Sequence, residues 1–198
     1  MIDFRLTRIF PQPLKSYPSQ EKFRVSSKEI GCGTPTDFAR QVLRTPILIG
    51  VISDTHGLLR PEALAALRGS EHIIHAGDVG APEILDELAA IAPLHAVRGN
   101  IDKGALARRL PETEVVEVGS ISIYVLHDLA QLDLKPEAAG FRVVIYGHSH
   151  VPKQEMRSGV LYFNPGSAGP RRFKLPVTVG RLTLEGGTAR AEIVKILD

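Results

Sequence analysis

Apolar and polar residues alternate in blocks through the middle of the chain, and these blocks predict strands followed by helices. The continuous apolar run at 47–52 is typical of a strand buried on both faces, and shorter runs follow at 72–76 and 93–98. Between them, the segments that begin at Pro61 and Pro82 predict helices, because proline is favoured in the first helical turn. The alternation therefore predicts βαβ units on a largely parallel sheet.

The remainder of the chain has the pattern of a β-rich segment. Two alternating runs flank Gly119 and Ser120 and predict a hairpin, and a second hairpin is predicted over 176–197. Further apolar runs at 142–146 and 160–164 predict two more strands. Two sheets packed face to face with helices outside accommodate both halves, so the fold class is α/β.

Residues 1–45 lack a sustained hydrophobic period and carry four prolines, so we expect a loosely ordered N-terminal extension before a single domain at 46–198. The extension holds eight basic and four acidic residues, whereas the domain holds 16 basic and 18 acidic ones. A dispensable tail and an arm that covers part of the domain both fit this composition. The slightly acidic domain, without a basic stripe, argues against binding of a long nucleic acid.

Composition indicates in which cellular compartment the protein is expected. The longest apolar run has six residues, far short of a membrane span, and the start of the chain lacks the apolar stretch of a secretory signal. One cysteine, Cys32, excludes an internal disulfide and any multi-cysteine metal site. We therefore expect a cytoplasmic protein that does not bind membranes.

Polar residues with metal-binding side chains follow five of the predicted strands directly. In open α/β sheets the carboxyl ends of the strands form the ligand-binding edge, and strands of one sheet bring these ends to one rim. We therefore expect these residues to converge. They are Asp54, His56, Asp78, Asn100, His127, His148 and His150.

The types of these side chains favour divalent metal ions. Carboxylate, amide and imidazole groups are hard to borderline donors, and sulfur is absent from the set. The set exceeds what one tetrahedral zinc ion needs and suits two ions about 3.5–4 Å apart that share a bridging ligand. Two such ions with two aspartates and a hydroxide leave a net charge of about +1, which attracts a phosphate ester.

The order of the motifs, D-x-H, G-D, G-N, H and G-H-x-H, resembles that of the calcineurin-like metallophosphoesterase superfamily. The resemblance covers about residues 46–198, is strongest to the compact YfcE-type phosphodiesterases and includes the segment NPGSAGPRR at 164–172. It implies a four-layer α/β/β/α sandwich. It assigns one ion to Asp54, His56, Asp78 and His150, and the other to Asp78, Asn100, His127 and His148.

The resemblance also implies an activity. We expect a metal-dependent phosphodiesterase that acts on a small phosphoester, in which a hydroxide bridging two metal ions attacks phosphorus in line. The residues expected to be catalytic are Asp78, Asn100 and His148. Manganese is the expected metal, with iron, nickel, zinc and magnesium as alternatives. The rival functions are a non-catalytic scaffold resembling the retromer subunit and a nuclease for short substrates. Exposed strand edges would permit a homo-oligomer.

Two positions depart from the family pattern. Ile101 stands where larger phosphatases carry a histidine that protonates the leaving group, so we expect a preference for good leaving groups. Asp128 stands where the compact branch has glycine, and its carboxylate could weaken binding of an anionic substrate or orient a ligand.

Five further residues have structural or functional alternatives. His72 is expected at the surface, and His75 either in the core or behind a metal ligand. Arg171 and Arg172 either approach a phosphate or belong to a solvated loop, and Asp102 is expected to cap a helix over 103–110.

Overall fold

The computed structural model describes residues 45–197, which form two five-stranded sheets packed face to face. The strands of the first sheet are β1 (Ile47–Ile52), β2 (His72–His75), β3 (Leu94–Ala96), β9 (Val177–Glu185) and β10 (Thr188–Leu197). The strands of the second sheet are β4 (Thr113–Val118), β5 (Ile121–Leu126), β6 (Val143–Ile145), β7 (Lys153–Arg157) and β8 (Val160–Asn164). The orders across the sheets are β10-β9-β1-β2-β3 and β4-β5-β6-β8-β7.

Both sheets are mixed. Strands β1, β2 and β3 are parallel, as the alternation of strands and helices predicted, but the C-terminal hairpin β9–β10 adds antiparallel strands beside β1. In the second sheet, β5, β6 and β8 are parallel and the edge strands β4 and β7 are antiparallel. Parallel pairing, which we expected throughout most of one sheet, is therefore limited to three strands in each of the two sheets.

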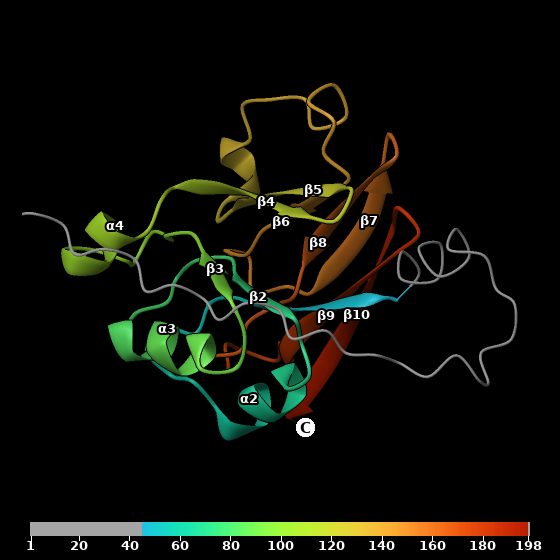
Figure 1. Ribbon diagram of the computed structural model, residues 1–198. Coiled ribbons are helices and arrows are strands. Elements are labelled where there is room, and N and C mark those ends of the chain that lie inside the picture. The colour runs from blue at the N-terminus through green and yellow to red at the C-terminus, as the bar shows by residue number, and fades with distance from the viewer. Residues whose placement is uncertain (1–44, 198) are drawn as a thin grey trace, which may run out of the picture.

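Helices cover the outer face of the first sheet. Figure 1 shows α2 (Pro61–Leu67) and α3 (Pro82–Ala89) on that side, and both begin at the prolines that predicted them. A short α4 (Ala105–Arg109) precedes β4. Leucine, isoleucine and alanine side chains from these helices pack on the outer face of the sheet. A second cluster, which includes Phe163, fills the space between the sheets and sets their separation.

The fourth layer lies on the outer face of the second sheet and is mostly irregular. It consists of the short 3₁₀ helix η1 (Leu129–Gln131) and the helical turn at 135–141, which packs Phe141 against Tyr124. Figure 1 shows this segment on the far side of β4 and β5 from α2 and α3. The mixed α/β fold with two sheets between outer layers is confirmed, with turns in place of long helices on one side.

The prediction for the N-terminal extension concerns residues that, apart from Thr45, lie outside the described range. Within residues 45–197, none of the helices has the length and apolar character needed to cross a membrane.

Candidate metal centre

The seven candidate residues come together where the two sheets meet, at the carboxyl ends of five strands. Strands β1, β2 and β3 bring Asp54, His56, Asp78 and Asn100 from the first sheet, whereas β5 and β6 bring His127, His148 and His150 from the second. We expected the strand ends of a single sheet to form this rim. That expectation was wrong, because both sheets contribute residues. The centre forms because the parallel strands of two facing sheets end at the same side of the sandwich.

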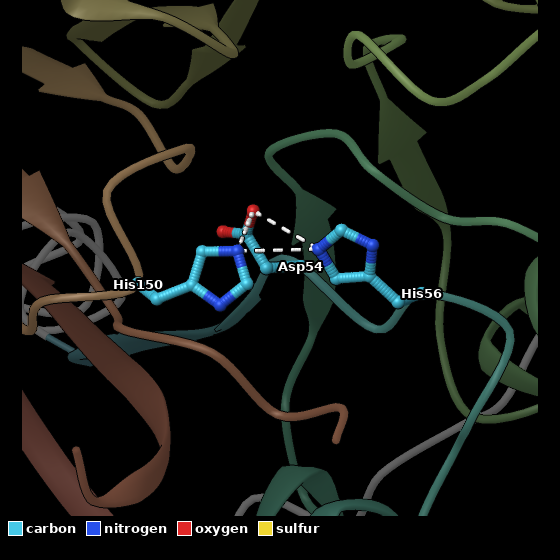
Figure 2. A group of neighbouring side chains, drawn as sticks. All are labelled: Asp54, His56 and His150. Carbon is cyan, nitrogen blue, oxygen red and sulfur yellow. Dashed lines mark hydrogen bonds and ion pairs between the residues drawn. The ribbon is translucent and has the colours of Figure 1, made fainter. Parts of the chain in front are cut away.

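The first group of donors is Asp54, His56 and His150. Oδ1 of Asp54 lies 3.3 Å from Nε2 of His150 and 3.9 Å from Nε2 of His56, and the two Nε2 atoms are 3.2 Å apart. Figure 2 shows the carboxylate between two rings whose nitrogens converge on it. Donor atoms from three side chains therefore face one small volume.

The second group is Asp78, Asn100, His127 and His148. Nε2 of His127 lies 3.4 Å from Oδ1 of Asp78 and 3.2 Å from Oδ1 of Asn100. Nδ1 of His148 lies 3.0 Å from the same Asn100 oxygen. Oδ2 of Asp78 is also 3.6 Å from Nε2 of His56, so Asp78 lies between the two groups.

The backbone of the centre is held in an unusual conformation. Asp54, His56, Asp78, His148 and His150 all have φ between 47° and 67°, in the left-handed region that non-glycine residues rarely adopt. Such conformations cost free energy and persist where surrounding structure imposes them, commonly at functional sites. Their concentration in the candidate residues indicates that the loops are shaped to aim these side chains inward.

Two glycines allow the loops to approach one another closely. A Cβ atom on Gly77 would lie 2.6 Å from Nδ1 of His127, and one on Gly99 would collide with the carboxylate of Asp78. These glycines are the first residues of the G-D and G-N motifs. Their function is to leave room for a ligand side chain from another loop.

The centre has a buried floor and an exposed rim. Asp54, Asp78, His127 and His150 are all buried, whereas Asn100 and His148 are exposed. Burial raises the pKa of Asp54 to about 6 and lowers the pKa of His150 to about 4. For Asp78, burial is outweighed by its interaction with the His127 ring and by a hydrogen bond from the backbone N–H of Ile101, so its pKa is lowered.

The donor atoms fit cations. Ser53 and the backbone N–H of His148 donate to Oδ2 of Asp54, which leaves Oδ1 buried without a hydrogen-bond partner among the described residues. An unpaired buried carboxylate oxygen is costly, and a cation would satisfy it. Nδ1 of His127 donates to the carbonyl of Ala76 at 2.8 Å, which leaves its Nε2 lone pair directed at two oxygen acceptors.

Asp102 supports the centre and does not cap a helix. It is 4% exposed, and its carboxylate accepts hydrogen bonds from the backbone N–H groups of Val79, Gly80 and Gly99 at 2.8–3.1 Å. Helix α4 begins beyond it, with Gly104 at the N-cap position and no side-chain cap. The prediction of an N-cap was wrong. The carboxylate accepts from amides of the G-D and G-N loops, and none of these amides belongs to α4.

The other histidines lie outside the donor set. His75 is fully buried, accepts from Gly77 N–H and lies 3.0 Å from the hydroxyl of Thr55, so it packs in the core behind the loop of Asp54. The ring of His72, at the opposite end of β2, lies against that of His95 at a tilt of 34°. His72 is half-buried, with its Nδ1 enclosed, so it is less exposed than expected.

Three other polar residues, which the sequence analysis did not weigh, hold the loops together. Ser53 binds Asp54, Thr55 donates to the carbonyl of Val79, and Asn164 donates to the carbonyl of Gly147. The available signal was a polar residue at the end of an apolar strand, which by itself does not distinguish a supporting residue from a turn.

Comparison with known proteins identifies a family whose name agrees with a metal centre of this kind. Residues 47–187 match the calcineurin-like phosphoesterase superfamily domain. A protein described as a probable metallophosphoesterase from Methanothermobacter thermautotrophicus is 39% identical over 160 residues, which are 75% of this chain and 92% of the relative.

Solved structures share the fold. A structure described as a novel archaeal phosphodiesterase has a TM-score of 0.63 and 25% identity, over 75% of this chain and 100% of the other. Vacuolar Protein Sorting 29 from Cryptosporidium parvum has a TM-score of 0.62 and 17% identity, over 77% of this chain and 99% of the other. The second likeness concerns the fold alone.

Proposed function

The chain belongs to the calcineurin-like phosphoesterase superfamily, and from this membership we propose that it is a dinuclear metal-dependent phosphodiesterase. The observation that carries the proposal is Oδ1 of Asp54, which is buried, lacks a hydrogen-bond partner among residues 45–197 and faces Nε2 of two histidines. A carboxylate oxygen in such surroundings is stable when a cation neutralises it.

Two cations divide the donor set. Asp54, His56, Asp78 and His150 would hold the first, and Asp78, Asn100, His127 and His148 would hold the second, in keeping with the position of Asp78 between the two groups. When bound, divalent ions such as manganese supply an activated water for in-line attack on phosphorus and neutralise charge on the phosphoryl oxygens.

The protein residues fix the donors before substrate arrives. Hydrogen bonds from Ser53 and from the amide of His148 orient Asp54, and the amide of Ile101 orients Asp78 at 3.0 Å. Asn100 and His148 lie at the exposed rim, where their side chains can reach a substrate. This division supports catalytic contacts by Asn100 and His148 above a fixed, buried floor.

A cavity beside the rim supports a diester as substrate. It has a volume of about 430 Å³, adjoins Asn100, His127 and His148, and is large enough for an ester group next to the phosphorus. Its other charged residues are Arg98, Glu112, Asp128 and Asp133. An excess of carboxylates in this cavity disfavours a long polyanion, so we propose a small substrate in preference to a long nucleic acid.

The departure at Asp128 is partly structural. Its Oδ1 accepts a hydrogen bond of 3.0 Å from the backbone N–H of Ala130 and caps η1, while the residue also lines the cavity. This capping contact is a third function, beside the two alternatives of weaker binding of an anionic substrate and orientation of a ligand.

A non-catalytic scaffold is the alternative from another functional class. A scaffold needs the fold and an interaction surface, but it does not need donors from five strand ends aimed at one volume. All seven positions carry metal-binding side chains, and their atoms lie within 3.9 Å of at least one other member of the set. This completeness favours catalysis.

The test combines metal analysis with turnover of bis(p-nitrophenyl) phosphate by purified protein reloaded with manganese. Wild-type protein is expected to bind two ions per chain and to hydrolyse the diester. Asp78→Asn is expected to lower both the metal content and the rate, the rate by at least about 100-fold, because it removes the carboxylate that lies between the two groups of donors.

The matched control is Asp86→Asn, which changes an exposed carboxylate on α3 that pairs with Arg109. It is expected to keep wild-type metal content and rate. A wild-type protein that binds two manganese ions and hydrolyses neither diesters nor monoesters would contradict the proposal and favour the scaffold.

A further inference from the structure

The segment 164–172 is tied to the loop that carries Asp54 and His56. The hydroxyl of Ser167 donates to the carbonyl of Asp54 at 2.9 Å, and the backbone N–H of Ala168 donates to the carbonyl of Ser53 at 3.1 Å. The hydroxyl of Ser53, whose one proton also faces Oδ2 of Asp54, lies 2.9 Å from the carbonyl oxygen of Gly166. These bonds fix the path of the segment relative to the first group of donors.

Close packing reinforces these hydrogen bonds. A Cβ atom on Gly169 would collide with the carbonyl of Thr55, so the two backbones touch at this point. The guanidinium of Arg60, at the start of α2, donates to the carbonyl of Gly169 through Nε and Nη2 at 3.4 and 3.3 Å. The residues that follow Gly169 therefore leave a well-defined position directly beside the centre.

The segment ends with Arg172 at the centre itself. Nη2 of Arg172 lies 3.4 Å from Nε2 of His56, the nitrogen that faces Asp54 and His150. Within residues 45–197, no carboxylate lies within ion-pair distance of Arg172. An exposed guanidinium without an anion is thus held against a metal-binding nitrogen.

A bound anion would stabilise the arrangement of Arg172 beside His56. When Nε2 of His56 gives its lone pair to a cation, the guanidinium can no longer use that lone pair and faces another positive charge. An anion that contacts both removes the repulsion, and a phosphoryl group offers oxygens in the geometry that a guanidinium binds best. We propose that Arg172 binds a nonbridging phosphoryl oxygen of the substrate, an inference that rests on the proposed function.

Arg172 is thus a substrate-binding residue in addition to the seven metal-binding ones, and the segment NPGSAGPRR acts as the brace that positions it. The neighbouring Arg60 has a different function, because its guanidinium is engaged by the carbonyl of Gly169. Of the alternatives weighed for Arg172, approach to a phosphate is favoured over a solvated loop residue.

The experiment measures binding of inorganic phosphate to the manganese-loaded protein by calorimetry, together with KM and kcat for bis(p-nitrophenyl) phosphate. Arg172→Ala is expected to weaken phosphate binding by about 10- to 100-fold and to raise KM, with the metal content unchanged. Arg172→Lys is expected to recover part of the affinity, because it restores the charge without the planar fork.

Lys174→Ala is the matched control, since it removes a positive charge from the same exposed loop. It is expected to keep wild-type phosphate affinity and KM. Equal phosphate affinity in wild type, Arg172→Ala and Lys174→Ala would overturn the inference. A fall of metal content in Arg172→Ala that accounts for the whole loss would also overturn it, because Arg172 would then act on His56.

The two proposals fail separately. If the wild-type protein has no diesterase activity but Arg172→Ala still weakens phosphate binding, the proposed reaction is refuted and Arg172 remains an anion-binding residue. If the wild-type enzyme is active and Arg172→Ala leaves its phosphate affinity and KM unchanged, the inference is refuted and the proposed reaction stands.

Discussion

The α-carbon of Gly147 packs directly against the carboxylate of Asp54, although 93 positions separate the two residues in the sequence. A Cβ atom at position 147 would lie 2.8 Å from Oδ2 of Asp54, closer than such atoms approach in folded proteins. The next residue, His148, donates its backbone N–H to the same oxygen at 3.2 Å. The two sheets thus meet through a contact that only glycine permits.

Gly147→Ala is therefore expected to displace Asp54 without removing a donor. Metal affinity should fall by at least about 10-fold, and the free energy of unfolding by about 1–3 kcal/mol, because a methyl group is forced into filled space. Calorimetric metal titration and urea unfolding measure the two effects.

Gly119→Ala provides the comparison, because Gly119 lies in the β4–β5 turn and a Cβ atom there meets nothing within 4 Å. It should lose some stability, since its φ of 60° disfavours alanine, and should keep wild-type metal affinity. Unchanged metal affinity in Gly147→Ala would show that the contact does not position Asp54.

Asp102→Asn tests the carboxylate that binds the G-D and G-N loops. The asparagine keeps the shape but loses the charge, and its NH₂ group would face a backbone N–H that Asp102 now accepts from. We expect the free energy of unfolding to fall by about 2–3 kcal/mol and metal affinity by about 10- to 100-fold. Asp86→Asn serves again as the exposed control, and equal unfolding curves for both variants would refute this function of Asp102.

His75 predicts a pH dependence of stability. Burial lowers its pKa to about 4 from an ordinary 6.5, so between these values the unfolded chain binds a proton that the folded chain does not. The folded state therefore loses stability as pH falls through this window, and this contribution is fully present above pH 6.5. Each pKa unit corresponds to about 1.4 kcal/mol, which gives about 2 kcal/mol between pH 7 and pH 5.

Comparison of metal-free wild type with His75→Gln isolates this contribution. Asp54, whose pKa burial raises to about 6, contributes a slope of opposite sign, but it does so in both proteins. The stability of wild type relative to the variant should therefore shrink as the pH falls from 7 to 5. A difference that stays constant over this range would mean that His75 is not kept neutral by burial.

Ile101 predicts the preference for leaving groups. Its side chain is 36% exposed and follows Asn100 at the rim, where it offers no proton. Ile101→His is expected to raise turnover of alkyl esters relative to aryl esters, by up to the 10²–10⁴-fold that general acid catalysis typically contributes. The measurement is the ratio of kcat/KM for matched alkyl and aryl phosphodiesters, and an unchanged ratio would count against the hypothesis.

Much of the local structure followed from the sequence. Proline at the first turn predicted α2 and α3, and the Gly119-Ser120 pair predicted the β4–β5 hairpin, because these signals act over a few residues. The sequence also indicated the candidate metal-binding residues, since each stands within a few positions of the end of an apolar run and carries its own chemistry. Local conformation and donor type are properties of short segments.

The sequence alone determined which side chains stand at the strand ends and which chemistry they favour. Only the tertiary structure decided that they come from two sheets, that Asn100 and His148 form an exposed rim, that Asp102 joins the G-D loop to the G-N loop, and that Arg172 reaches His56. The physical reason is that hydrophobic patterns specify strands but not their order. Contacts between segments many residues apart depend on which strands become neighbours and how closely their loops can pack.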